Sequence, residues 1–493
     1  MEYNTLGAVD LGSNSFHLAV GRVVEDQIYP LDSLKETVRL GSGLTPDREL
    51  DSLAQDRALS ALKRFAERLA GMPREAVRVV GTNALRVAKN AGPFLRRAES
   101  TLGFPIEIIP GREEARLIYL GVVHSLPMSS TNRMVVDIGG GSTEFIIGNK
   151  MRPKAMESLY MGCVSYTTRY FPDGRIDKKG LRQAELAARG QVQTIATRFE
   201  KEGWKEAVGS SGTARSIAEI LLKNGQSERG ITATGLGWLR EQLLEAGDIR
   251  KLSIAGLRED RIPVVAGGVA IMSGVFSELS LNRMTVADGA LRDGVLWDLL
   301  GRVHHRDIRD VTVDQFMRRY HVDQAQAQRV GQLAETLLRG TEGKKDDLAP
   351  VAPFLGWAVK LHEIGISIAQ GAYHKHSAYI LANADMPGFS KQEQGYLSNL
   401  VLAQRGKLVK MGAAFDDDKR LAALAFCLRL AVILYRSRRT LKLPKLRVSR
   451  TGEGFRLEVE GRWLADHSLV ALALDAEREQ WDSVGFKLEF VET

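Results

Sequence analysis

The chain of 493 residues is 44% hydrophobic and 26% charged, which is the composition of a globular protein. Its length excludes a fold built on one hydrophobic core and predicts three or four domains. The formal charge of +8 favours an acidic partner, although charge alone does not distinguish nucleic acid from a smaller polyanion.

Cysteine usage and apolar stretches bear on where the protein resides. Cys163 and Cys427 lie far apart without metal-ligand spacing, so we expect two buried, reduced thiols. The N-terminus has no basic segment followed by an apolar one, and no secretion signal is expected. The apolar stretches Val264–Phe276 and Leu421–Tyr435 are too short for a bilayer or are interrupted by Arg429. We therefore expect a cytoplasmic protein without a transmembrane segment, and leave peripheral association with a membrane open.

The first 125 residues alternate predicted strands and helices, as in an α/β domain. Strands are expected at Leu6–Asp10, Phe16–Val24, Gln27–Glu36, Val77–Gly81 and Ile106–Ile109, and helices after Ser52, from Pro93 and at Gly111–His124. In the helix after Ser52, apolar residues from Leu59 to Leu69 recur at helical spacing and predict one buried face.

A second half begins at Arg133 and opens again with a pair of strands. It continues with an expected helix at Lys178–Glu200, a strand at Glu206–Gly209, a buried helix at Ile262–Leu279, a strand at Met284–Ala287 and a helix ending near Leu300. The pattern is then helical to about Arg439, so we place a boundary near residue 305. From Leu446 onwards the alternation of a small sheet returns.

A glycine-rich turn between two buried strands occurs twice. The segment Met134–Gly148 reads MVVDIGGGSTEFIIG, and the earlier segment Val9–Gly21 matches it at an offset of 127 residues in a Val, an Asp, an aliphatic residue, two glycines and a Ser. This echo predicts two related halves. We expect their two hairpins to face one cleft and to clamp phosphate between them.

Each part of that turn has a chemical reason. Glycine permits positive φ and close approach to a ligand, and successive N–H groups suit an anionic oxygen. Hydroxyls come from Ser13, Ser15, Ser142 and Thr143. The carboxylates of Asp10, Asp137 and Glu144 would repel phosphate unless a divalent cation, expected to be Mg²⁺, lies between them. An ordinary turn with solvated acids explains either copy alone, but the duplication favours the functional interpretation.

Two further segments have both a functional and a simpler interpretation. The loop Ser210–Thr213 enters a helix and is a third candidate anion site, although helix capping alone accounts for it. Glu113 and Glu114 begin the helix at Gly111, where the helix dipole by itself favours acids.

In combination, these motifs resemble those of the exopolyphosphatase and guanosine pentaphosphate phosphatase family, a branch of the sugar kinase, Hsp70 and actin superfamily. The matching stretches are DLGSNSFHL at Asp10–Leu18, GTNALR at Gly81–Arg86, EEARLIYLGV at Glu113–Val122, DIGGGSTE at Asp137–Glu144, GSSGT at Gly209–Thr213, DGALRDGVL at Asp288–Leu296, HEIGISI at His362–Ile368 and HSAYIL at His376–Leu381. They cover essentially the full length.

The resemblance implies an α/β fold class, with two actin-like (ribonuclease H-like) lobes at residues 1–125 and 126–304. It further implies an all-helical HD-like domain at 305–440, a small C-terminal α+β domain at 441–493, and a homodimer. No binding of duplex nucleic acid is expected.

The resemblance also implies a reaction, the processive exopolyphosphatase reaction, in which water attacks the terminal phosphoryl of polyphosphate and releases orthophosphate. Glu114 is the expected general base, assisted by Asp137 and Glu144. Mg²⁺ is expected at Asp10, Asp137 and Glu144, and K⁺ is a second candidate cation. The expected phosphate-binding residues are Ser13, Asn14, Arg39, Arg86, Gly139, Gly140, Gly141, Ser142, Ser211, Gly212 and Thr213.

Three alternatives stay open at this point. The first is a 5′-phosphatase of guanosine pentaphosphate (pppGpp) in the stringent response, alone or beside polyphosphate hydrolysis. The second is an ATP-dependent kinase or chaperone on the same lobes, although neither Gly343-Lys344 nor Gly406-Lys407 continues as a Walker A loop. The third is a non-catalytic sensor.

Two features lie downstream of the lobes. His362-Glu363 is similar to the HD dyad, but Glu363 replaces the Asp, so we expect a structural helix there. The basic run that contains Arg436, Arg438 and Arg439 is either a solvated face or a cationic track for polyphosphate.

Overall fold

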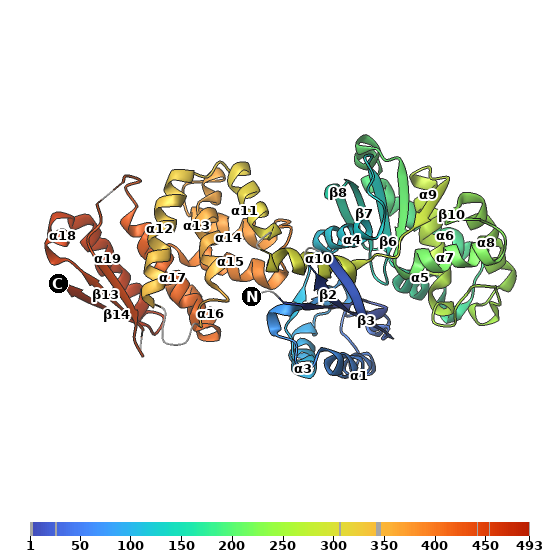
Figure 1. The fold of residues 1–493 in the computed structure, drawn as a ribbon, viewed down its shortest axis with the longest axis horizontal. Helices are drawn as coiled ribbons and strands as arrows, with labels where there is room; N and C mark the ends of the chain where they lie inside the picture. The colour runs from blue at the N-terminus through green and yellow to red at the C-terminus, as the bar shows by residue number, and fades with distance from the viewer. Residues whose placement is uncertain are drawn as a thin grey trace. The chain divides into compact units, whose positions relative to one another are not determined.

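The computed structural model describes residues 3–24, 27–304, 307–341, 347–440, 442–452 and 454–492 (Figure 1). The Gly343-Lys344 pair and the predicted boundaries at residues 305 and 441 lie outside these ranges. The chain forms two compact units, one of the first 308 residues and one that begins at Arg309. Each unit is considered separately below.

The first unit contains two mixed sheets. The first sheet has the order β3-β2-β1-β4-β5 and the second has the order β10-β11-β9-β6-β7-β8. The strands of the first are β1 (Thr5–Leu11), β2 (Ser15–Val24), β3 (Gln27–Thr37), β4 (Val77–Gly81) and β5 (Ile106–Ile108). Those of the second are β6 (Arg133–Ile138), β7 (Thr143–Asn149), β8 (Arg152–Leu159), β9 (Glu206–Ser210), β10 (Ile231–Thr232) and β11 (Arg283–Val286).

The two sheets repeat one connectivity. In each, three consecutive strands form an antiparallel meander, and the first of them pairs on its other side with a parallel strand that is followed by a second parallel strand. Asp10 lies opposite His17 in the first hairpin, and Asp137 lies opposite Glu144 in the second. The predicted duplication of the first 300 residues is therefore confirmed.

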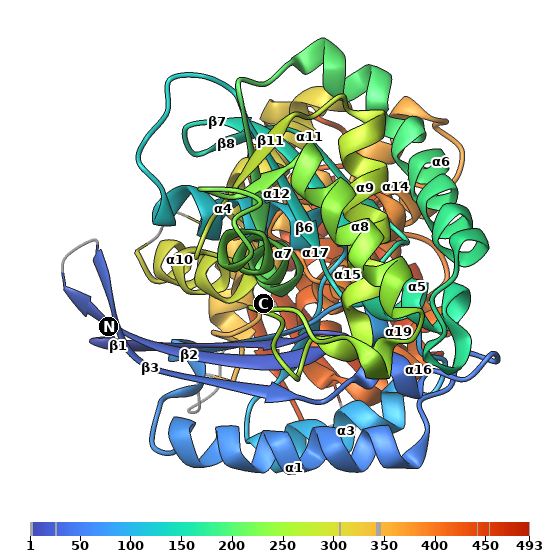
Figure 2. The ribbon, with the colours of Figure 1, turned by 90° about the vertical axis from the view of Figure 1, so that its right-hand side faces the viewer.

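Amphipathic helices cover the first sheet on one face (Figure 2). They are α1 (Ser52–Leu69) and α3 (Ala91–Leu102), and the short α2 (Asn83–Val87) follows β4. Helix α1 starts where its N-cap Asp51 accepts a hydrogen bond from the Ala54 amide, and it buries Leu62, Phe65 and Leu69 against the strands. The predicted helix after Ser52 is thus confirmed.

Two helices lie between the sheets. These are α4 (Gly111–Ser125) and α10 (Leu291–Val303), and their apolar residues share one core with Leu6 and Ala8 of the first sheet and Val135 and Ile146 of the second. In Figure 1, α10 crosses the region where the two lobes meet. Because α10 packs on the first sheet, α4 packs on the second and the two helices pack on each other, the pair connects the two lobes mechanically.

The remaining helices of the first unit pack on the second sheet. They are α5 (Cys163–Tyr170), α6 (Lys178–Glu202), α7 (Ser211–Lys223), α8 (Ala233–Ala246) and α9 (Val265–Glu278). The buried helix expected from Ile262 starts as a 3₁₀ turn at Ile262–Val264, which contains Pro263, and becomes α-helical at Val265. The expected Ser210–Thr213 loop is wrong, because β9 ends at Ser210 and α7 begins at the next residue, Ser211, with a φ of 64°.

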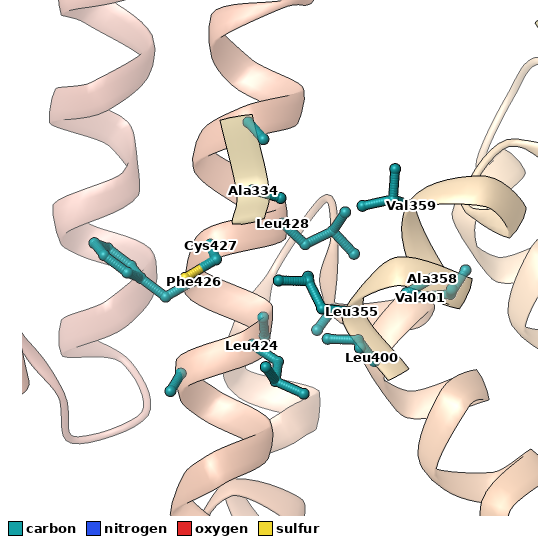
Figure 3. Packing of buried hydrophobic residues seen from close by; sticks show 14 of the residues in the cluster. Ala334, Leu355, Ala358, Val359, Leu400, Val401, Leu424, Phe426, Cys427 and Leu428 are labelled. Atoms are coloured by element: carbon teal, nitrogen blue, oxygen red, sulfur yellow. The ribbon is translucent and has the colours of Figure 1, made fainter. Parts of the chain in front are cut away.

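The second unit combines helices with a three-stranded sheet of order β12-β13-β14. Its helices are α11 (Ile308–Arg319), α12 (Gln324–Thr341), α13 (Ala352–Leu361), α14 (Tyr373–Asn383), α15 (Lys391–Ala403), α16 (Gly412–Asp417), α17 (Lys419–Leu434), α18 (Gly461–Asp466) and α19 (Ser468–Asp482), and its strands are β12 (Leu446–Arg450), β13 (Gly454–Val459) and β14 (Lys487–Glu492). One apolar cluster spans both parts. Figure 3 shows its packing among α12, α13, α15 and α17. Phe426 of α17, for example, stacks on Phe455 of β13 with ring centroids 4.2 Å apart.

The structure also bears on the two cysteines, on membrane-spanning helices and on His362. Cys163 and Cys427 are buried free thiols, as predicted. None of the helices within the described ranges has the length and apolar character needed to cross a bilayer. His362 ends α13 with Nδ1 2.6 Å from the Val359 carbonyl oxygen, which agrees with a structural role for this motif.

Candidate active site

A cleft of about 440 Å³ opens between the two lobes of the first unit. Its walls include Ser13 and Asn14 of the first hairpin, residues 139–142 of the second, and Glu114 of α4. Ser211, Gly212 and Thr213 at the start of α7 also line it. Residues from segments 200 positions apart in the sequence therefore meet in one cavity.

The two hairpin loops touch each other. A Cβ atom on Gly140 would lie 2.9 Å from Ser13 Cβ and 3.0 Å from the Asn14 amide nitrogen, and one on Gly141 would lie 2.3 Å from Asn83 Oδ1. Of the glycines in the two turns, none has a φ in the left-handed region. The expected need for positive φ is therefore wrong, and close approach between the lobes is what requires glycine here.

Hydrogen bonds from neighbouring segments hold both hairpin loops in place. Ser13 Oγ accepts from the Ala84 amide at 3.2 Å, and Thr213 Oγ1 donates to the Ile138 carbonyl at 2.9 Å. The amides of Cys163 and Val164, at the start of α5, donate to the carbonyls of Gly139 and Gly140. These bonds explain why the hydroxyls and glycines are needed for loop geometry, while their contact with phosphate stays a prediction.

Four buried carboxyl groups interact around the cleft, and the pKa of each lies above its usual range. For Asp10, burial and then the charge of Glu114 raise the pKa, and for Glu144 the causes are burial and then the charges of Glu114 and Asp137. Burial also raises the pKa of Asp137, although hydrogen bonds from Ser211 and Ser210 oppose it. Several carboxyl groups that resist ionisation together suit a site that also receives cations.

The fit to a magnesium ion rests on the donor chemistry. Asp10 Oδ1 is buried without a hydrogen-bond partner, and carboxylate oxygens are the hard ligands that Mg²⁺ prefers. Within the described ranges, no group of three or more His, Cys, Asp or Glu side chains is arranged to hold a metal ion. Glu144 instead accepts a hydrogen bond from Ser158 Oγ at 2.8 Å. A site with one or two carboxylates, completed by water and phosphate oxygens, fits these residues.

Glu114 is paired with one of the two predicted arginines. Arg86 Nη1 lies 3.1 Å from Glu114 Oε2 and also donates to the Ile109 carbonyl at 2.8 Å. Burial raises the pKa of Glu114, Arg86 lowers it, and the net result is a raised pKa. Arg39 differs, because its backbone amide donates to the Asn14 carbonyl at 2.8 Å while the residue is absent from the cleft wall.

Several cleft residues escaped the sequence-based prediction. The basic ones are His17, Lys35, Arg215, Arg258, Arg261 and Arg292. Arg292 and His17 lie inside the matched motifs and could have been found there. Lys35 and Arg258 lie between motifs, and only the fold brings Lys35 of β3 to 2.8 Å from Asp260 of the other lobe.

The predicted polyphosphate-track residues belong to the second unit. Arg436 and Arg439 are exposed. Arg438 forms ion pairs with Glu363 and with Asp323, the latter at 3.2 Å, so its charge is already neutralised. The role of these three arginines as a polyphosphate track stays a prediction, and Arg438 would have to exchange its acidic partners for phosphate.

Family models match most of the chain. The model described as the Ppx/GppA phosphatase family matches residues 19–303, and that of Ppx/GppA phosphatase domain III matches residues 308–478. The chain belongs to the Ppx/GppA phosphatase family. It is a phosphoanhydride hydrolase, as the matched motifs predicted.

Individual relatives agree with this assignment. The chain is 38% identical over 494 residues to a guanosine-5′-triphosphate,3′-diphosphate pyrophosphatase of Pseudoalteromonas translucida (strain TAC 125), covering 98% of both. An exopolyphosphatase structure from Cytophaga hutchinsonii has 28% identity and a TM-score of 0.56, covering 60% of this chain and 98% of that one. A Ppx/GppA enzyme structure from Aquifex aeolicus has 23% identity and a TM-score of 0.50, with 59% and 98% covered. The actin-like α/β fold with a helical third domain is thus established.

Proposed function

We propose that this protein hydrolyses the terminal 5′-phosphoryl group of pppGpp, with Glu114 as the general base. The observation that carries the proposal is the buried Glu114 carboxylate, which faces a cleft formed by two phosphate-type loops. The substrate is suggested by the relative from Pseudoalteromonas translucida, which is named for this nucleotide and is matched over 98% of its length.

In the proposed reaction, a water oxygen attacks the terminal phosphorus, the bond from phosphorus to the bridging oxygen breaks, and orthophosphate leaves. Glu114 accepts the proton of the attacking water, and its raised pKa makes it a stronger base than an exposed carboxylate. Arg86 holds the Glu114 carboxylate through its 3.1 Å ion pair. Phosphoryl transfer depends on such positioning and on charge neutralisation.

A magnesium ion would be held by Asp10 and Asp137 with water and substrate oxygens, and when bound it supplies charge neutralisation of the phosphates. The cations Arg215, Arg261 and Arg292 line the same cleft and favour a multiply charged anion. A potassium requirement, a homodimer and a cytoplasmic location stay predictions.

Polyphosphate is the second candidate substrate. It is favoured by the likeness of the first unit to the Cytophaga hutchinsonii exopolyphosphatase. Exposed Arg436 and Arg439 offer positive charge for a long chain. Replacing both by Gln is expected to weaken binding of long polyphosphate more than hydrolysis of short chains, and equal effects on both would contradict a track.

The decisive experiment compares the parent and Glu114→Gln in phosphate release from pppGpp, long polyphosphate and ATP. We expect pppGpp turnover to exceed the other two, and the variant to lose about 10²- to 10⁴-fold in kcat while it still binds substrate. Faster ATP turnover would favour a kinase-like or chaperone-like activity. Unchanged activity of the variant would remove Glu114 from the mechanism, and no activity in the parent would favour a sensor.

A further inference from the structure

Helix α4 carries two adjacent glutamates with different surroundings. Glu114 lines the cleft, whereas Glu113 accepts two hydrogen bonds of 2.8 Å from Arg116, one turn further along the same helix. Adjacent residues of an α-helix point about 100° apart, so the face of Glu113 and Arg116 is turned away from that of Glu114. The direction in which Glu114 points therefore depends on what holds the other face.

That other face is held by Asp298 of α10, which is only 6% exposed. Asp298 accepts from Arg78 Nη1 of β4 at 2.7 Å, from Arg302 Nε of its own helix at 3.0 Å, and from Arg116 Nη2 of α4. Burial would raise the pKa of Asp298, but the three arginines hold it below its usual range. One ionised carboxylate thus joins a strand of the first sheet to both central helices.

The network has a specific geometry. Arg78 also donates two hydrogen bonds to Glu107 of β5, at 3.1 and 2.9 Å, so among the described residues the network contains three arginines and three acids. Compared with apolar side chains of the same size, buried ion pairs contribute little net stability. Their directional hydrogen bonds do, however, fix how the connected elements are placed.

Backbone contact leaves the two helices little freedom. A Cβ on Gly294 of α10 would lie 1.8 Å from the Leu117 carbonyl oxygen, and one on Gly121 of α4 would lie 2.2 Å from the Ala290 carbonyl oxygen. The helices therefore touch through their main chains. Ala290 and Leu291, at the start of α10, line the cleft beside Glu114. The helix pair thus forms one wall of the site.

We propose that Asp298 is a positioning residue for phosphoanhydride hydrolysis: it fixes the rotation and register of α4 against α10 and so holds the Glu114 carboxylate towards the attacking water. This inference rests on the proposed role of Glu114. Asp298 is not among the residues that line the cleft, and it acts through Arg116 and Glu113.

The test is a double-mutant cycle between Asp298→Asn and Glu114→Gln, read by steady-state phosphate release from pppGpp in the full-length protein. We expect Asp298→Asn to lower kcat about 10- to 50-fold with less than a two-fold change in KM. In the Glu114→Gln background it should have no further effect, because the group that it positions is already lost.

The matched control is Glu477→Gln in the second unit, since Glu477 is likewise a buried acid, 2.8 Å from Arg429 Nε. It is expected to lower the melting temperature without lowering kcat.

If Asp298→Asn does not fold, Arg302→Lys is the milder variant, with a smaller loss of kcat expected at a native melting temperature. Equal loss in both Glu114 backgrounds, or a raised KM with unchanged kcat, would overturn the positioning role. Full activity of Glu114→Gln would overturn the proposed function instead.

Discussion

The two hairpins of the cleft have the same backbone and different charges. In each, an aspartate is the second-last residue of the first strand, but the residue opposite Asp10 is His17 and the residue opposite Asp137 is Glu144. Burial and then Arg292 and Lys35 lower the pKa of His17 to about 3, whereas the pKa of Glu144 is raised. The duplication thus supplied two loops that touch, and the residue opposite each aspartate made one hairpin acidic and the other neutral.

The largest expected effect is a difference in kcat between variants of the two hairpins. Glu144→Gln should lower kcat about 100-fold or more, because it removes a buried carboxyl group that interacts with Glu114 and Asp137. His17→Gln exchanges one neutral side chain for another and should cost about five-fold or less. Phosphate release at pH 7.5 measures both, with circular dichroism to verify folding. Equal losses would mean that the two hairpins contribute alike.

The contact between the loops gives the next prediction. Gly140→Ala should reduce kcat/KM about 10- to 100-fold, since the new methyl group would meet Ser13 Cβ and the Asn14 amide across the lobes. Gly12→Ala is the matched change in the other hairpin, where the Cβ would lie 2.8 Å from the Ser15 carbonyl of its own turn. We expect Gly12→Ala to destabilise its own turn. We expect Gly140→Ala to alter the closure of the two lobes, and small-angle scattering with and without substrate can detect that change. A scattering profile of Gly140→Ala identical to the parent's would count against this view.

How much of this could be predicted from the sequence depends on how local each signal is. Asp10 and Asp137 lie in short motifs whose chemistry is visible in the residues themselves, the role of Glu114 followed from the family resemblance, and the duplicated turn predicted the repeated sheet. Lys35 and Asp260 are 225 positions apart, and Arg78 and Asp298 are 220 apart. Pairs that depend on how lobes and central helices pack leave no periodic or motif signal. The glycines were recognised as phosphate-binding residues, which stays a prediction, but their close contact with the other loop was not foreseen.

Stability against pH should have opposite slopes for the two hairpins. The raised pKa of Glu144 means that the folded state retains a proton on this side chain. The contribution of Glu144 to the free energy of unfolding is therefore present below about pH 4.5 and is lost as the pH rises. The lowered pKa of His17 means the reverse, a contribution present above pH 6.5 and lost as the pH falls towards 3. With a chelator present, Glu144→Gln should melt roughly 2 °C or more above the parent at pH 7 and equal it at pH 4. His17→Gln should gain on the parent only below pH 6.5, and parallel curves for both variants would refute the assigned shifts.

The smallest expected effect concerns the ion pair that bridges the mouth of the cleft. Lys35 Nζ of the first lobe lies 2.8 Å from Asp260 Oδ2 of the second, with both side chains about a quarter exposed. Solvent screens such a pair, so Lys35→Met should lower kcat/KM only about two- to five-fold at low salt. A double-mutant cycle with Asp260→Asn isolates the pair from the contacts of Asp260 with Arg258 and Arg261. If the pair helps to close the lobes, the coupling should vanish at about 1 M salt, where the screening length is about 3 Å. If the effects of the two substitutions on kcat/KM are additive at low salt, the pair does not contribute to lobe closure, which would then depend on the central helices and the touching loops.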